Sequence, residues 1–493
     1  MTYDTVLHYI KKHAEEQGDT LAVCEMNRAV TYAGYWELIR RTASVLASRG
    51  IKKGDHVIIR NFQNIDYLAA FSALQYIGAL PIPLEKSINE ERIAEVAEKV
   101  GAAAVISSKS VDGYPFIETA AVAKESGTAE PLTAELPHAD DRSMMLYTTG
   151  TTGASKGIVM HHRGDVAIAG NVICGTQMKK GNVEILPMPL NHSFAVRRYQ
   201  SVMVNGGTVC LMNGIVFIGV LWKMMDKYKA TSLALAPAAL SVIFRLSEDK
   251  LGEYGDRLDY IQLGSAPLPE AEKHRLQKLL PKTRLYNIYG STEAGCSSVL
   301  DFSGADDTPG SIGRPTVNSA VAFMDENGNM MEKAEKETPG LMCWGGPIVM
   351  EGYYGDPEET ARTVENGFVK TSDLGYMDEE GRCIMIGRAD DIINSGGNKI
   401  APVEIEEIAN AFDGVMESAC TGLMDELLGE VPVLVVVPER DSYDRAGLMK
   451  YLSERIEGYK LPRSIIDARE LPKTFNGKLL RRKIKEQVNA VRR

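Results

Sequence analysis

Short apolar runs alternate with amphipathic stretches along most of the first 300 residues. We expect strands at 56–60, 102–108, 207–213 and 258–266, because each run is short, apolar and rich in β-branched residues. The segment 268–280, LPEAEKHRLQKLL, instead spaces its leucines as one face of a helix. Strands and helices that alternate in this order predict an α/β fold with parallel sheets.

The pattern changes after about residue 310. From 310 to 390, glycines and acidic turns such as MDENGN and MDEEGR break the apolar runs, which predicts a β-rich subdomain. After residue 400 we expect a helix (PVEIEEIANAF), two strands (ESACTGLM and VPVLVVVPE), another helix and a basic tail. The chain therefore divides into a large domain of α/β and β-rich subdomains, 1–389, and a small α+β domain, 390–493.

Composition narrows the class of protein. The 493 residues are 44% hydrophobic and 25% charged, which is typical of a globular protein with at least two domains. The net charge of −11 argues against a general nucleic-acid binder, since phosphate contacts need clustered Lys and Arg. Seven scattered cysteines favour a reducing compartment, and the apolar run 215–222 is far shorter than the roughly 20 residues of a membrane-spanning helix. We expect a cytoplasmic protein.

One loop concentrates the residues that bind anions. The stretch YTTGTTGASKG, 147–157, combines a flexible backbone with hydroxyls and one ammonium. It is not a Walker A loop, because Lys156 follows Ser155 and precedes Gly157. Composition alone leaves a polar surface turn as the alternative to a phosphate-binding loop.

Four further motifs follow this loop in order. They are NIYGSTEAG (287–295), KTSDLG (370–375), GRADDIINSGGNKI (387–400) and LPKTFNGKLLRR (471–482). With the first loop they resemble the motifs of the adenylate-forming superfamily of acyl-CoA synthetases, peptide-synthetase adenylation domains and beetle luciferases, over nearly the whole chain. The resemblance implies that a carboxylate attacks the α-phosphate of ATP, which releases pyrophosphate, and that a thiol then displaces AMP.

The resemblance assigns roles around the triphosphate. Lys156 supplies a charge to the β and γ phosphates, which are cradled by Thr148, Thr149, Gly150, Thr151, Thr152 and Gly153. Thr292 offers a hydroxyl to the α-phosphate, and Glu293 binds Mg²⁺, with Thr148 as a second metal ligand. The alternative for Glu293 is a carboxylate at a strand end that faces solvent.

The nucleoside is assigned in the same way. Tyr289, between Asn287 and Gly290 of the same motif, offers a ring against which adenine stacks, and the GSAP turn with Gly264, Ser265 and Ala266 lies beside adenine and the acyl pocket. Asp373 accepts hydrogen bonds from the ribose hydroxyls, and Arg388 is its partner for ribose and phosphate. As isolated residues, Asp373 and Arg388 equally suit a structural ion pair.

The resemblance also implies two poses of the small domain. Asp390 is the hinge. In the adenylating pose Lys478 reaches the α-phosphate and the acyl carboxylate. In the second pose the loop with Ser395, Gly396 and Gly397 lines the thiol tunnel instead. The alternative for Lys478 is an ordinary surface charge.

The segment PLNHSFAVRR, 189–198, corresponds to the mouth of the acid pocket. We expect His192 there as a catalytic residue, with Phe194 nearby. Amino-acid-activating relatives carry an Asp in this region, whereas no Asp or Glu lies between Asn191 and Asn213, so an unpaired substrate ammonium is disfavoured. The pair Arg197 and Arg198 either recognises a second polar group of the substrate or, as we favour, is solvated or terminates a helix.

We conclude from the sequence that the chain is an AMP-forming acyl-CoA synthetase, a ligase that uses ATP, Mg²⁺ and coenzyme A on a fatty or aromatic acid. One alternative is a stand-alone ligase that loads the phosphopantetheine of a separate carrier protein. Another is a non-catalytic nucleotide-binding homologue. The tail from Lys478 onward, with seven Lys or Arg against Glu486, either holds the phosphates of coenzyme A or is a solvated helix.

Overall fold

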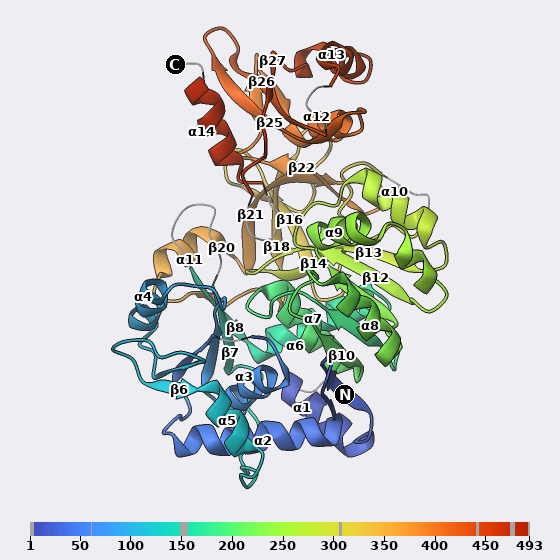
Figure 1. Cartoon of the computed structure of the whole chain (residues 1–493). Coiled ribbons are helices and arrows are strands. Elements are labelled where there is room, and N and C mark those ends of the chain that lie inside the picture. Colours follow the sequence, from blue (N-terminus) through green and yellow to red (C-terminus); the bar gives the residue numbers. More distant parts are fainter. Residues whose placement is uncertain are drawn as a thin grey trace.

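A computed structural model describes residues 4–60, 62–147, 156–304, 308–439, 443–473 and 479–491. Its largest sheet runs β15-β14-β13-β12-β11-β9-β10-β1-β2 (Figure 1). The strands are β1 (Leu21–Cys24), β2 (Ala29–Thr31), β9 (Val183–Leu186), β10 (Thr208–Leu211), β11 (Ser232–Leu235), β12 (Tyr260–Gly264), β13 (Arg284–Ser291), β14 (Gly295–Asp301) and β15 (Arg314–Pro315). From β1 to β13 the neighbouring strands are parallel, as the sequence predicted.

Helices accompany these parallel strands. α7 (Ser193–Asn205), α8 (Ile218–Tyr228), α9 (Pro237–Ser247) and α10 (Glu270–Leu279) connect strands that follow one another from β9 to β13, with a 3₁₀ turn at Lys250–Tyr254. α1 (Val6–Glu16) precedes β1, α2 (Tyr32–Ser48) follows β2, and α6 (His162–Gly175) precedes β9. The strands predicted at 207–213 and 258–266 and the helix at 268–280 are confirmed as β10, β12 and α10.

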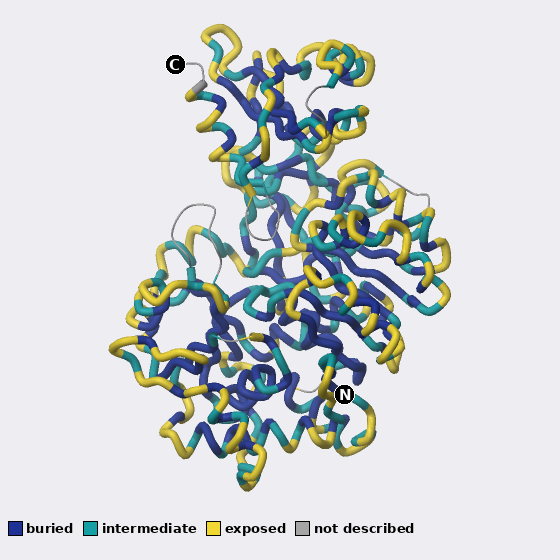
Figure 2. Tube along the Cα trace, in the orientation of Figure 1, coloured by how far each residue is buried: buried dark blue, intermediate teal, exposed yellow. Residues whose placement is uncertain are grey.

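Alternating side chains of the nine-stranded sheet enter two different cores. Val209 and Leu211 face the core that includes α1, α2 and α7, whereas Cys210 between them faces the core beneath α8 and α9. In Figure 2 the sheet is the most continuous buried region of the chain, and the exposed segments lie in the surrounding loops and helix faces. The short apolar runs are thus strands that are covered on both faces, which is the usual state of a parallel sheet.

Two smaller sheets complete the α/β part. The parallel sheet β4-β3-β5-β6 is accompanied by α3 (Ile65–Ile77), α4 (Glu90–Val100) and α5 (Thr119–Ser126). Its strands are β3 (His56–Arg60), β4 (Leu80–Pro83), β5 (Ala104–Ser107) and β6 (Phe116–Glu118). The antiparallel sheet β19-β8-β7 is formed by β7 (Arg142–Tyr147), β8 (Gly157–His161) and β19 (Gly352–Tyr353). The strands predicted at 56–60 and 102–108 are confirmed.

The region from 310 to 390 is rich in strands, as predicted. Its sheet runs β17-β16-β18-β21-β20, and β22 pairs with β21. The strands are β16 (Ala320–Met324), β17 (Met330–Met331), β18 (Gly340–Gly345), β20 (Val364–Glu365), β21 (Phe368–Met377) and β22 (Cys383–Arg388). One short helix, α11 (Pro357–Thr363), was not predicted. Asp356 begins it by accepting the N–H of Glu359, and Pro357 suits its first turn.

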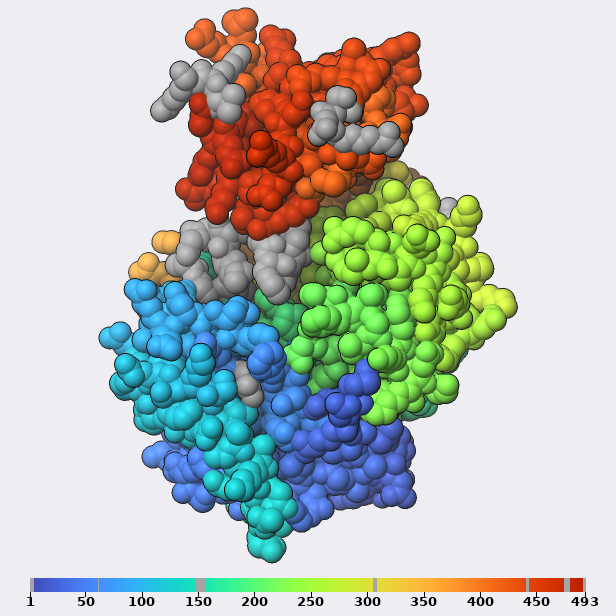
Figure 3. Space-filling view, in the orientation of Figure 1, coloured from blue at the N-terminus to red at the C-terminus, as the bar shows by residue number. Residues whose placement is uncertain are grey.

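The last elements form a separate small sheet that sits beyond β21 and β22 (Figures 1 and 3). Its order is β24-β23-β26-β25, and β27 pairs with β26. The elements are β23 (Ile393–Ser395), β24 (Asn398–Ile400), β25 (Val415–Asp425), β26 (Gly429–Pro438), β27 (Ser464–Asp467), α12 (Pro402–Asn410), α13 (Arg445–Ser453) and α14 (Arg481–Val491), with a 3₁₀ turn at Gly458–Lys460. The expected helix–strand–strand–helix order is confirmed. Among the described helices, none has the length and apolar character needed to cross a bilayer.

Candidate active site

The candidate site lies where the parallel strands end. Carboxyl ends of neighbouring parallel strands meet at one edge of a sheet, and ligands of open α/β sheets bind there. The pairing of Leu263 with Asn287 and of Gly264 with Ile288 sets the GSAP turn beside β13. Ser265 has φ +74°, which is uncommon for a residue with a side chain and is found most often at functional sites.

The ring of Phe194 lies against this turn. A Cβ atom on Gly264 would come within 2.8 Å of the Phe194 ring, so the close packing requires glycine. Phe194 belongs to α7, the helix that begins directly after His192. The structure therefore brings the predicted acid-pocket segment and the predicted adenine-side turn together.

A tight hairpin turn presents Thr292 and Glu293. A Cβ on Gly290 would lie 1.8 Å from the carbonyl oxygen of Gly295, so only glycine permits β13 and β14 to approach in this way. The hydroxyl of Ser291 accepts the N–H of Ala294 and closes the turn. The Thr292 hydroxyl donates to the Ser193 hydroxyl at 3.2 Å, which links the turn to the start of α7.

Glu293 is partly buried and does not simply face solvent. Its Oε1 accepts a hydrogen bond of 3.0 Å from the hydroxyl of Tyr353. Among the described residues no group of three or more His, Cys, Asp and Glu is arranged to hold a metal. A single oriented carboxylate fits Mg²⁺, which usually binds one or two carboxylates and fills its remaining positions with phosphate oxygens and water.

The ammonium of Lys156 lies over the ring of Tyr353, whose hydroxyl binds Glu293. The Lys156 Nζ forms an ion pair of 2.5 Å with Glu359 of α11 and lies 4.7 Å from the centre of the Tyr353 ring. Thr148, Thr149, Gly150, Thr151, Thr152 and Gly153 lie outside the described residues, and so does Lys478. Tyr353 and Glu359 were missed by the sequence analysis, because nothing in YYGDPEET identifies residues that meet a loop 200 positions away.

The predicted ribose-binding residues meet as neighbours on two strands. Asp373 of β21 pairs with Arg388 of β22, and the Arg388 Nε lies 3.8 Å from the Asp373 Oδ1. The Tyr289 hydroxyl donates to the other carboxylate oxygen. The Nε of Arg388 has no hydrogen-bond partner within the described chain. At 3.8 Å it therefore interacts with Asp373 through charge, without a hydrogen bond.

His192 precedes α7 and is largely shielded from solvent. Burial lowers the pKa of His192, and the nearby Glu85 carboxylate only partly opposes this effect. The imidazole is therefore neutral at neutral pH and carries no charge into this part of the structure.

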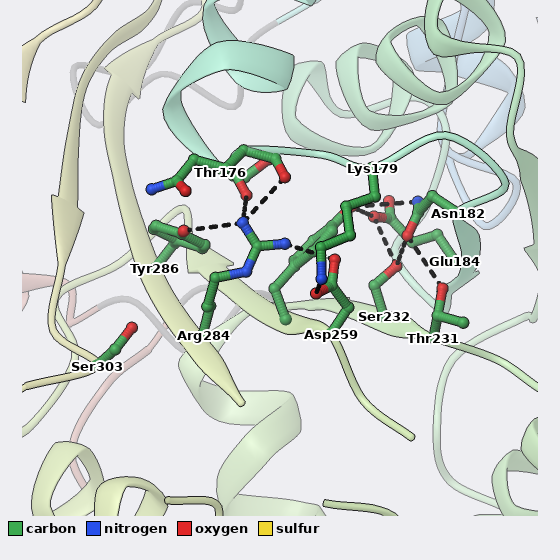
Figure 4. Close-up of polar contacts among 12 residues, drawn as sticks. Thr176, Lys179, Asn182, Glu184, Thr231, Ser232, Asp259, Arg284, Tyr286 and Ser303 are labelled. Carbon is green, nitrogen blue, oxygen red and sulfur yellow. Dashed lines mark hydrogen bonds and ion pairs between the residues drawn. The ribbon is translucent and has the colours of Figure 1, made fainter. Parts of the chain in front are cut away.

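The position of Arg198 contradicts both interpretations of the arginine pair, recognition of the substrate and a solvated or helix-terminal position. Arg198 is 1% exposed and lies within α7, where it forms a two-pronged ion pair with Glu184 and donates to the Tyr260 hydroxyl at 2.7 Å. Figure 4 shows Glu184 next to Asn182 and Ser232, at the amino-terminal ends of β9 and β11. Arg198 is thus neither solvated nor available to a substrate, because it points to the edge of the sheet opposite the site.

Arg197 is also buried, and it points the other way. Its two terminal nitrogens donate to the carbonyl oxygens of Ser291 and Thr292, each at 2.6 Å. The expected solvated position was wrong, because the side chain is 6% exposed in the middle of the helix. Its two hydrogen bonds join α7 to the turn that carries Glu293, so these two terminal nitrogens are occupied by the protein's own backbone.

Asp165 of α6 lies close to Arg197 and is fully buried. Neither carboxyl oxygen has a hydrogen-bond partner in the described chain. Burial raises the pKa of Asp165 to about 7, and the nearby Ser143 hydroxyl and, to a smaller extent, the Arg197 charge only partly oppose this effect. Burial likewise lowers the pKa of Arg197 to about 10, which leaves the guanidinium protonated at neutral pH.

The connection to the small sheet contains the predicted hinge. The N–H of Ala389 donates to the backbone carbonyl of Ser372 in β21 at 2.7 Å. The carboxylate of Asp391 lies 3.4 Å from the Arg481 Nε. Arg481 also forms two hydrogen bonds with Glu406, at 2.6 and 2.7 Å. Asp390 is exposed between these two anchored residues.

The predicted thiol-tunnel loop is a β-hairpin. Gly396 and Gly397 have φ of +56° and +85° and form the two-residue turn between β23 and β24. Ser395 before them is buried, and the N–H of Gly396 donates to the Leu428 carbonyl at 2.8 Å. The three residues therefore lie in a fixed hairpin of the small sheet.

We predict that Asp165→Asn stabilises the protein above neutral pH. An unfolded Asp has a pKa of about 3.9, so between that value and about 7 the folded protein keeps a proton that the unfolded chain has lost. Stability therefore falls as the pH rises through this window. At pH 8 the melting temperature of the variant should exceed that of the parent by at least about 2 °C, and the difference should disappear near pH 4. A variant that is less stable than the parent at pH 8 would show that Arg197 needs an ionised Asp165.

Comparison with known proteins gives the family. The AMP-binding enzyme family matches residues 10–354, and the AMP-binding enzyme C-terminal domain matches residues 404–478. The chain is 28% identical over 482 residues to long-chain-fatty-acid–CoA ligase FadD13 of Mycobacterium tuberculosis, covering 94% of this chain and 93% of that protein. It is 26% identical to 2-succinylbenzoate–CoA ligase of Bacillus mycoides, covering 98% and 99%.

Solved structures share the fold over the same length. ATP-bound MatB from Rhodopseudomonas palustris has a TM-score of 0.89 at 22% identity and covers 99% of this chain and 100% of its own. O-succinylbenzoate CoA synthetase from Bacillus subtilis, in complex with an acyl-adenylate intermediate, has a TM-score of 0.86 at 23% identity and covers 97% of each chain. Because the family match extends over well more than half of the sequence, the protein belongs to the AMP-binding enzymes, and the prediction of an adenylate-forming enzyme is confirmed.

Proposed function

We propose that the protein activates a fatty or aromatic carboxylic acid as its acyl-adenylate and transfers the acyl group to coenzyme A. One observation carries this proposal. The turn with Thr292 and Glu293 is tied to α7 by the Ser193 hydroxyl and by Arg197, so the nucleotide side and the acid side of the site form one rigid unit. Such a unit suits a reaction whose main requirement is to align a carboxylate with a phosphate.

In the first half-reaction a carboxylate oxygen of the acid attacks the α-phosphorus of ATP. The bond to the bridging oxygen breaks, and its electron pair leaves with pyrophosphate. Thr292 donates to the α-phosphate, and Lys156 neutralises charge on the β and γ phosphates. Glu293 would hold Mg²⁺, which would supply further charge neutralisation when bound. Asp373 and Arg388 hold the ribose, and Tyr289 packs against adenine.

In the second half-reaction the thiol of coenzyme A attacks the acyl carbon. The bond between the acyl carbon and the oxygen bound to phosphorus breaks, AMP leaves, and the thiol proton passes to solvent. This step needs the hairpin of Ser395, Gly396 and Gly397 near the acyl group, whereas the first step needs Lys478 there. We infer that the small domain, 390–493, turns relative to residues 1–389 between the two steps.

The contacts around Asp390 support it as the pivot. The N–H of Ala389 donates to the Ser372 carbonyl in β21 of the β-rich sheet, whereas Asp391 pairs with Arg481 of the small domain. Asp390 lies between these anchors and is exposed, so a change in its backbone angles leaves both anchors in place and disrupts only the turn in which the N–H groups of Asp391 and Ile392 donate to the Arg388 carbonyl.

The names of the relatives guide the choice of acid and acceptor. They act on a long-chain fatty acid, on 4-coumarate and on 2-succinylbenzoate, and each is a CoA ligase. The basic tail offers less free charge than the sequence predicted, since Arg481, Arg482 and Lys485 pair with Glu406, Glu486 and Glu430. We therefore favour coenzyme A over a carrier protein on the strength of the relatives, and not because of the tail.

A panel of acids tests the proposed function directly. ATP–pyrophosphate exchange is measured with fatty acids of several lengths, hydroxycinnamates, aryl diacids and amino acids, followed by thioester formation with coenzyme A or with carrier protein. We expect exchange with at least one fatty or aromatic acid and thioester formation that saturates with coenzyme A. Exchange with no acid would favour a non-catalytic homologue, and transfer to carrier protein alone would favour the stand-alone ligase.

We predict that Arg197→Lys slows adenylation. Lysine keeps the charge but cannot donate to both carbonyl oxygens in the fork geometry, so the turn with Glu293 loses one anchor. We expect acid-dependent pyrophosphate exchange to fall about tenfold, which corresponds to about 1.4 kcal/mol. Arg163→Lys, which alters a surface ion pair with Asp140, is the matched control. An unchanged rate in Arg197→Lys, measured below the melting temperature of both variants, would refute the positioning role.

A second variant separates the two half-reactions. Proline at position 390 fixes φ near −65° and restricts the residue before it, so the change Asp390→Pro should prevent the turn of the small domain. We expect pyrophosphate exchange to persist while thioester formation from acyl-adenylate falls at least about tenfold. Asp390→Ala, which removes the carboxylate without fixing the backbone, should keep the parent's ratio of the two rates. Equal losses in both half-reactions of Asp390→Pro would place the pivot elsewhere.

A further inference from the structure

A segment far from the phosphate loop in sequence is attached to the loop's end. β19 pairs with β8, so that Gly352 lies opposite Val159 and Tyr353 lies opposite Ile158. The N–H of Tyr354 donates to the carbonyl of Gly157 at 2.8 Å. Because Gly157 follows Lys156 directly, the position of residues 352–354 is fixed relative to the predicted phosphate-binding ammonium.

The helix after β19 is packed onto the same strand. The Thr360 hydroxyl accepts the N–H of Tyr353 at 2.9 Å, and a Cβ on Gly352 would come within 2.7 Å of the Thr360 side chain. Asp356 accepts the N–H of Glu359 at 3.0 Å and holds it in the first turn of α11. These contacts direct the Glu359 carboxylate toward Lys156.

Lys156 and Glu359 form a partly shielded ion pair. Their side chains are 29% and 27% exposed, and their charged atoms lie 2.5 Å apart. The hydrogen bond from Lys156 lowers the pKa of Glu359, so the carboxylate is ionised at neutral pH. In the same segment the Tyr353 hydroxyl donates to Glu293, so residues 353–359 contact both the phosphate-binding and the metal-binding side chains.

We propose that Glu359 is the internal counter-ion of Lys156, that it competes with the β and γ phosphates of ATP for this ammonium, and that it promotes the release of pyrophosphate. The inference rests on the proposed function, in which Lys156 binds phosphate. A carboxylate 2.5 Å from the ammonium repels an incoming triphosphate and must give up its hydrogen bond. Once pyrophosphate leaves, Glu359 forms its ion pair with Lys156 again, which opposes the rebinding of pyrophosphate and so the reverse reaction. Glu359 is therefore a positioning residue that acts through Lys156.

The proposal predicts a gain of affinity, which damage to the fold does not produce. Glu359→Gln keeps the size of the side chain and removes its charge. Binding of ATP and of pyrophosphate, each with Mg²⁺ but without acid or coenzyme A, is measured by titration calorimetry. We expect both dissociation constants to fall about two- to fivefold, the range of a partly exposed ion pair. Glu358→Gln is the matched control, because this neighbouring carboxylate is 85% exposed and its ion-pair partner in the described chain is Arg362, at 3.9 Å, which Glu359 also approaches, at 3.5 Å. It should bind as the parent does.

The Lys156→Ala background tests whether the effect passes through the pair. There, Glu359→Gln should change neither dissociation constant. Unchanged or weaker binding in the single variant, or an equal gain in the Lys156→Ala background, overturns the proposal. Because these are binding measurements, they do not depend on turnover. A parent protein that binds ATP but exchanges pyrophosphate with no acid refutes the proposed function alone, and a parent that binds no ATP refutes both.

Discussion

Two hydrogen bonds from one buried guanidinium determine the geometry of the site. Arg197 donates to the carbonyl oxygens of Ser291 and Thr292, and this contact joins α7 to the hairpin turn of β13 and β14. The Nε of Arg197 has no hydrogen-bond partner in the described chain, so these two bonds are the ones that compensate for the burial of its charge, and losing either would be costly. Thr292, Glu293 and the start of the acid pocket are held in register as a result.

The neighbouring arginine joins the same helix to the opposite edge of the sheet. Successive residues of a helix point about 100° apart, and Arg198 accordingly reaches Glu184 and Tyr260 at the amino-terminal edge of the sheet. Two adjacent arginines thus bind α7 to the sheet at two places: Arg197 to the turn after β13, and Arg198 to the amino-terminal edge. The segment 352–363 reaches the same site from the opposite side, through Tyr353 to Glu293 and through Glu359 to Lys156.

Sequence reasoning predicted what local pattern and ordered motifs determine. The parallel α/β strands follow from their apolar runs, and Tyr289, Asp373 and Arg388, which come from three separate motifs, lie side by side. Sequence reasoning failed for side chains whose burial depends on partners that are distant in the sequence. A pair of arginines predicts a solvated face, because most arginines are exposed, and only the fold supplies Glu184 and two carbonyl groups as partners. Glu359 has no signal of its own, since its partner is 203 positions away.

The central claim is that a carboxylate of the substrate attacks the α-phosphorus of ATP in this rigid unit. Transfer of ¹⁸O tests it most directly. The acid that supports exchange is labelled with ¹⁸O in both carboxylate oxygens, and the full reaction is run with coenzyme A. The mass of the product AMP is then measured by mass spectrometry. Attack at the α-phosphorus followed by thiol attack at the acyl carbon predicts one ¹⁸O atom in each AMP. Unlabelled AMP, or ¹⁸O found instead in inorganic phosphate, would contradict the account.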